Sequence, residues 1–139
     1  MADDGGISRL RNRLRAIPDR VKEAVQPALL KQGNAMAGTM KQFVPVLTGD
    51  TRDSITVTPG GKSTPAYSQP GGSSVVPENA VAITVGDHEV RTAHLVEYGT
   101  KHAPAQPFFW PAVRLHQKKA KNAIKRAVGK AVREGWGKP

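Results

Sequence analysis

Two long stretches with apolar residues at helical spacing, one near each end of the chain, most constrain the fold. Between residues 18 and 43 the stripe comprises Val21, Val25, Ala28, Met36, Thr39 and Phe43. Gln32 interrupts this stripe. Between residues 108 and 134 the stripe comprises Val113, Ala120, Ile124, Ala127 and Ala131. Residues three or four apart share one face of an α-helix, so two long helices are expected. The second stripe is mostly alanine, which allows a neighbouring helix to approach closely.

Prolines set the expected limits of the first long helix. Pro18 suits the first turn of a helix, because that turn leaves its N–H groups unpaired and proline has none. Residues 1–17, which are rich in arginine, are then expected to form a basic N-terminal arm or a short helix. Pro27 lies inside the apolar stripe and is expected to kink or split the helix. Pro45 and Gly49 are expected to end it.

The middle of the chain predicts a small sheet and a short helix. Residues 54–58 alternate with Ile55 and Val57 on one face, and residues 80–85 alternate in the same way. The long loop between them, residues 59–79, is rich in Gly, Ser and Pro, and such loops are typically functional or disordered. Residues 91–99 predict a short helix that stops at Gly99.

Together these elements predict an α+β fold. Two long helices are expected to pack on one face of a small, mostly antiparallel sheet, with a long Gly/Ser/Pro-rich loop between the strands. A chain of 139 residues fits one domain. The interpretation is a basic arm at residues 1–17, a single α+β domain at residues 18–134 and a flexible tail at residues 135–139.

Charge is unevenly distributed along the chain. The net charge is +10, and it is carried by the two ends, with residues 44–113 at −2 and residues 114–139 at +8. A basic end of this kind can bind an acidic protein or the DNA backbone, although a basic face that is simply exposed to solvent is the plainer explanation. The candidate contacts with a partner or with DNA are Arg114, Lys118, Lys121, Lys125 and Lys130.

Catalysis and metal binding find little support. The chain has no cysteine, and its best polar group comprises His88, His94, Glu97 and His102. His94 and Glu97 could share a helix face, but one such pair is weak evidence for a metal site. We therefore expect no enzyme activity, no catalytic or metal site and no cofactor. No stretch approaches the length of a membrane span, so no membrane partner is expected.

Two sequence blocks carry a family resemblance. Residues 44–55 are similar to a "P-V-x-T-G-x-L-R-x-S-I" signature, and residues 94–112 resemble "hydrophobic-E-[FY]-G-T … P-A-x-P-F-x-x-P-A". In this order and spacing the blocks resemble the neck, or tail-completion, proteins of long-tailed phages, which include minor tail components and the lambda-like tail completion protein. The motif residues, which are expected to define the fold, are Pro45, Thr48, Gly49, Arg52, Ser54, Glu97, Tyr98, Gly99, Thr100, Pro107, Phe108, Pro111 and Ala112.

The resemblance implies a structural virion protein at the head–tail junction. Such a protein would assemble as a ring of about six copies that joins the head connector to the tail tube. Its partners would be copies of itself, head-closure or connector proteins, and tail terminator or tail tube proteins. It would reside in the virion, and in the host cytoplasm during assembly. The alternative is a non-specific DNA-binding module that uses the basic C-terminal helix, with contact to packaged DNA.

Overall fold

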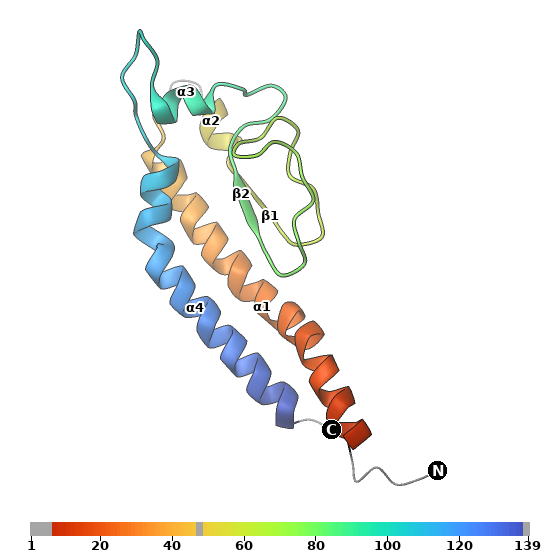
Figure 1. Cartoon of the computed structure of the whole chain (residues 1–139). Coiled ribbons are helices and arrows are strands. Elements are labelled where there is room, and N and C mark those ends of the chain that lie inside the picture. The colour runs from red at the N-terminus through yellow and green to blue at the C-terminus, as the bar shows by residue number, and fades with distance from the viewer. Residues whose placement is uncertain (1–6, 47–48, 138–139) are drawn as a thin grey trace.

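The computed structural model describes residues 7–46 and 49–137 and has a mixed α+β fold (Figure 1). The broad class of the expected fold, α+β, is therefore confirmed. Three parts of the predictions lie outside the described residues: the motif residue Thr48, part of the N-terminal arm and part of the C-terminal tail. The elements in chain order are α1 (Ile7–Phe43), α2 (Asp50–Asp53), β1 (Thr56–Thr58), β2 (Ala82–Thr84), α3 (Ala93–Tyr98) and α4 (Phe109–Gly137).

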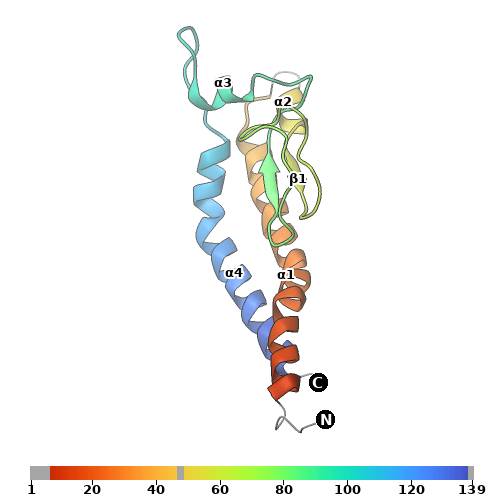
Figure 2. The ribbon, with the colours of Figure 1, turned by 45° about the vertical axis from the view of Figure 1, so that its right-hand side comes forward.

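The two long helices, α1 and α4, run antiparallel along much of the molecule (Figures 1 and 2). Near one end the Thr39 hydroxyl and His116 Nε2 lie 2.6 Å apart, and near the other Arg20 donates to the Gly135 carbonyl at 3.2 Å. Between these contacts Ala120 and Ala131 of α4 are buried. Their small side chains let the helix backbones approach, as the alanine stripe predicted.

Helix α1 is continuous over 37 residues, or about 55 Å. The helix start expected at Pro18 is wrong, because Pro18 and Pro27 both lie inside α1. Each proline removes one backbone hydrogen bond, but most of a helix's stability in a protein comes from packing of its apolar face. Here α4 packs along α1, and the Gly135 carbonyl near its end accepts from Arg20, two residues after Pro18.

The sheet is a two-stranded antiparallel ladder in which Thr56, Val57 and Thr58 oppose Thr84, Ile83 and Ala82. Both strands contact α1, and α1 lies between the ladder and α4 in Figure 1. Helix α1 is therefore the element on which both the sheet and the second long helix assemble. The two strands are shorter than expected. The expected strand residues that lie beside the ladder and outside it are 54, 55, 80, 81 and 85.

The long loop at residues 59–79 folds back on itself. Its two limbs are joined by backbone bonds from Gly61 to Val76, from Val76 to Lys62 and from Thr64 to Ser74, at 2.8–2.9 Å. A further bridge joins Gln69 to Val85 at the end of β2. The segment thus forms an irregular hairpin attached to the sheet.

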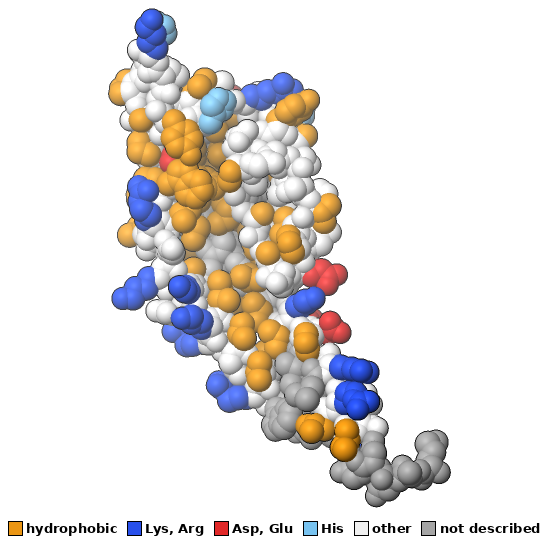
Figure 3. Space-filling model, in the orientation of Figure 1, with side chains coloured by type: hydrophobic (Ala, Val, Ile, Leu, Met, Phe, Trp, Pro, Cys, Tyr) orange, Lys and Arg blue, Asp and Glu red, His pale blue; other side chains and the backbone are white. Residues whose placement is uncertain are grey.

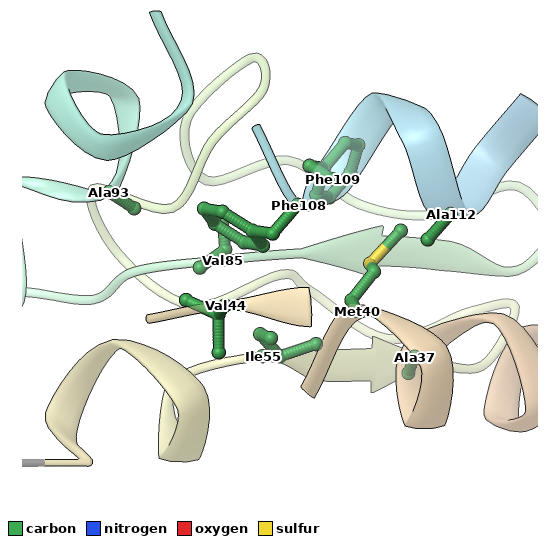
Figure 4. Packing of buried hydrophobic residues seen from close by; sticks show 9 residues of the cluster. All are labelled: Ala37, Met40, Val44, Ile55, Val85, Ala93, Phe108, Phe109 and Ala112. Atoms are coloured by element: carbon green, nitrogen blue, oxygen red, sulfur yellow. The ribbon is translucent and has the colours of Figure 1, made fainter. Parts of the chain in front are cut away.

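The main hydrophobic core lies where α1, the strands and the start of α4 meet (Figure 4). Phe108 and Met40 are fully buried at its centre. Phe43, expected on the buried stripe, is 44% exposed, because α1 ends there and Val44 turns inward instead. The clustered residues are Ala37, Met40, Val44, Ile55, Val85, Ala93, Phe108, Phe109 and Ala112.

Gly33 lies at a close contact between α1 and the sheet region. A Cβ added there would lie 3.2 Å from Val57 Cγ1 and 3.3 Å from Val81 Cγ1. We expect Gly33→Leu to lower the free energy of unfolding by about 2 kcal/mol, because a larger side chain must push these two valines away. Urea denaturation followed by circular dichroism measures the effect.

Gly38 supplies the matched control, since it lies in the same helix and a Cβ added there meets nothing within 4 Å. Gly38→Ala should raise the free energy of unfolding by about 0.5–1 kcal/mol, through the better helix propensity of alanine. If Gly33→Leu were as stable as the wild type, the tight helix–sheet contact would be refuted.

Candidate functional site

The junction of α3 and α4 is organised by the buried carboxylate of Glu97. One of its oxygens accepts hydrogen bonds from the backbone amides of Phe108 at 2.7 Å and Phe109 at 2.9 Å. The other accepts from the amide of Trp110 at 3.1 Å. The first N–H groups of a helix have no partner within the helix, and a negative charge there is favourable. Glu97 therefore caps α4 from a different helix.

Two family-motif residues shape the connection between Glu97 and α4. Gly99 has a φ of 78°, and a Cβ there would lie 2.7 Å from the backbone nitrogen of Ala105. Only glycine suits both the positive φ and this close approach. Pro111 lies in the first turn of α4, where no N–H is needed. The chain from Gly99 to Pro111 thus leads into the amides at the start of α4 that the Glu97 carboxylate binds.

The connecting loop projects from the end of the molecule. Its turn is held by the Thr100 hydroxyl, which accepts from the amides of His102 at 3.2 Å and Ala103 at 3.1 Å. Gln106 donates from its backbone to the Val96 carbonyl at 2.8 Å and closes the base of the loop. Residues 100–107 are all exposed, Pro107 included. Figure 2 shows the loop standing clear of the helices.

An aromatic patch lies beside this junction. Trp110 Nε1 donates to the Tyr98 hydroxyl at 2.7 Å, while Trp110 and Tyr98 are 38% and 68% exposed. The Trp110 ring meets Phe109 edge-on, with centroids 5.0 Å apart. A small pocket of about 370 Å³ next to these rings is also lined by Pro70 and His94. Tyr98 was predicted as a motif residue, but the sequence pattern did not reveal the aromatic patch.

The first motif block forms the turn between α1 and β1. Gly49 has a φ of 87°, as expected for a glycine turn. The buried Ser54 hydroxyl donates to the Thr51 carbonyl at 2.7 Å and accepts from the Gly86 amide at 3.0 Å. Arg52 makes an exposed ion pair with Asp53. Within the described part of the block the polar groups thus bind neighbouring backbone or each other.

The structure does not bring the four polar candidates together as a metal site. Among residues 7–46 and 49–137, no group of three or more His, Asp or Glu side chains is arranged to hold a metal ion. The Glu97 carboxylate is occupied by hydrogen bonds to α4, while His88, His94 and His102 are exposed.

Backbone amides of Val90 and Glu89 lower the pKa of Asp87 below its ordinary value. The ionised carboxylate therefore stabilises the turn at residues 87–90, and this contribution is lost as the pH falls through the lowered pKa.

The basic candidates lie along the outer side of α4. All five are exposed, and of these only Lys130 has an acidic partner in the described chain, Glu134 at 4.0 Å. Four follow one another at three- or four-residue spacing and so form one row, whereas Lys130 lies off that row. We call this row the α4 basic row; it comprises Arg114, Lys118, Lys121 and Lys125.

An acidic groove that sequence analysis missed lies between α1 and the folded loop. It has a volume of about 690 Å³ and is lined by Asp19 and Glu23 of α1 and Glu78 of the loop. The wall is fixed by Gln26, whose side chain donates to the Ala80 carbonyl at 3.1 Å. Glu78 is 55 residues from Glu23 in the chain, so no local pattern could reveal the pairing.

These observations define a small α+β scaffold in which the glycine turns and the buried Glu97 carboxylate hold the framework together. None of the described helices is both long enough and apolar enough to cross a membrane. The model of the family described as "Bacteriophage HK97-gp10, putative tail-component" matches residues 8–99. The matched residues include α1, both strands, α3 and Glu97, so the chain belongs to this family of phage tail components. A virion component is thus the class to which this protein is assigned.

The other two comparisons give no further relatives. No curated protein and no solved structure matches the chain significantly. The resemblance to phage neck and tail proteins, expected from the two motif blocks, is confirmed by the family match.

Proposed function

We propose that this protein is a non-enzymatic structural subunit of the phage head–tail junction, where it assembles as a ring that joins the head connector to the tail tube. The observation that carries the proposal is the family match over residues 8–99, which covers most of the framework. The Glu97 cap adds α4 to that framework and presents its basic row outward. Neighbouring head-closure and tail terminator proteins are the proposed partners.

The use of polar side chains supports a structural role. At the α3–α4 junction the buried carboxylate binds three amides of the chain itself. At the α2–β1 turn the buried serine hydroxyl bonds two backbone groups. Groups engaged in this way hold elements in place, whereas a general acid, base or nucleophile must be free to reach a substrate.

Deleting the gene for this chain tests the proposal in the phage itself. We expect filled heads and separate tails in electron micrographs, and few infectious particles. Expression of the wild-type chain from a plasmid should restore joined particles, which serves as the control. Cryo-electron microscopy of wild-type virions should show the chain between capsid and tail. Joined, infectious particles without this chain would contradict the proposed role.

A further inference from the structure

The α4 basic row is an unpartnered helix face. Its four cations form no ion pair with any residue in the described ranges, and the row spans about 17 Å along the helix. Leu115, adjacent to Arg114 and one turn from Lys118, is 65% exposed. A row of cations beside an exposed aliphatic side chain is a surface to which a protein partner with the opposite charge can bind.

A complementary surface exists on the same molecule. The acidic groove contributes Asp19, Glu23 and Glu78, and none of these carboxylates forms an ion pair within the part of the chain that the structure describes. Among the described residues that line the groove Lys22 is the one cation, so this lining is net negative although the whole chain is strongly positive. Val75, in the same folded loop as Glu78, is 69% exposed.

The two surfaces lie on opposite edges of the molecule. Helix α1 separates α4 from the sheet and loop in Figure 1, and Figure 3 shows basic side chains on the α4 edge and acidic ones on the edge beyond α1. A chain cannot bring its own opposite edges together, but it can offer each edge to a different neighbour. Contacts between unlike surfaces of identical subunits form closed rings when the rotation between them closes.

We propose that the α4 basic row of one copy docks against the acidic groove of a second copy, with Leu115 and Val75 adding apolar contact. This inference rests on the ring in the proposed function and names the two surfaces that form it. The partner is a second copy because the chain itself supplies the complementary charge. The contact is heterologous, so each subunit uses one edge toward each neighbour.

Charge reversal with rescue tests the proposal on the full-length protein. The basic-row variant is Lys121→Glu/Lys125→Glu and the groove variant is Glu23→Lys/Glu78→Lys. Mass photometry and light scattering at low salt should show oligomers for the wild type and at least about tenfold weaker assembly for either variant alone. In an equimolar mixture the reversed groove of one variant can meet the reversed row of the other, and the unchanged row can meet the unchanged groove, so the mixture should assemble again.

A matched control carries the same change in net charge as the basic-row variant, but on other surfaces. Lys31→Glu/Lys101→Glu replaces two exposed lysines that belong neither to α4 nor to the groove, and it should assemble as the wild type does. Circular dichroism of every variant checks that it is folded. Assembly should also weaken as salt rises, since exposed charges are screened over about 10 Å at 0.1 M.

Three outcomes would overturn this inference. A wild-type chain that stays monomeric at low salt would exclude the self-contact, as would variants that assemble as the wild type does. Loss of binding to duplex DNA in the basic-row variant, with assembly unchanged, would assign the row to DNA instead. None of these results affects the virion role, which the gene deletion tests separately, so failure of the interface and failure of the function are distinguishable.

Discussion

Glu97→Ala should lower the free energy of unfolding by about 3 kcal/mol. The substitution removes the acceptor for the amides of Phe108, Phe109 and Trp110, two of which belong to buried residues. A buried amide without a partner costs about 1–3 kcal/mol, and a charged acceptor makes the lost bonds stronger than average. The favourable interaction of the carboxylate with the positive end of α4 is lost as well.

Urea denaturation measures this effect, and two further variants serve as comparisons. Glu97→Gln keeps one oxygen acceptor and should lose less stability than Glu97→Ala. Glu89→Ala removes an exposed carboxylate eight residues earlier in the chain and should change stability by no more than about 0.5 kcal/mol. Equal stability of Glu97→Ala and the wild type would show that the cap contributes nothing, and would leave the docking of α4 without its polar anchor.

Phe108→Ala should be the most damaging single truncation in the core, at about 3–5 kcal/mol. The Phe108 side chain is fully buried and packs among residues from α1, the β1 and β2 regions and the start of α4 (Figure 4). Its removal leaves a cavity where these elements meet. Thermal and urea unfolding report the change in free energy.

Phe43→Ala is the control, because it makes the same substitution at another phenylalanine. Phe43 is 44% exposed at the end of α1, so its removal should cost far less than that of Phe108. Similar costs for the two substitutions would mean that the core is not centred on Phe108. The pair therefore separates burial from the general effect of deleting an aromatic ring.

The helices and strands could be predicted because their signals are local. The alanine stripe of α4, with Ala120 and Ala131, faces α1 as its spacing indicated, and Gly99 ends α3. Pro18 was misleading for a tertiary reason. Its cost to a helix is fixed by the backbone, but the packing of α4 that offsets this cost involves residues about 100 positions away.

The candidate site could be predicted only in part for the same reason. The motif blocks identified Glu97 and Gly99, but the partners of the carboxylate depend on how α3 is oriented toward α4. The acidic groove depends on the course of the 59–79 loop, which places Glu78 near Glu23. The basic row needed only helical spacing, so its residues were found from the sequence.

The antiparallel course of α1 and α4 has a practical consequence for imaging. The start of α1 and the last turns of α4 lie together, where Arg20 reaches Gly135, and the projecting 100–107 loop lies at the far end (Figure 1). A small fluorescent or gold tag fused to either terminus would therefore mark the same pole of every subunit. In a circular assembly the tags would lie together along one rim and reveal which side faces the capsid.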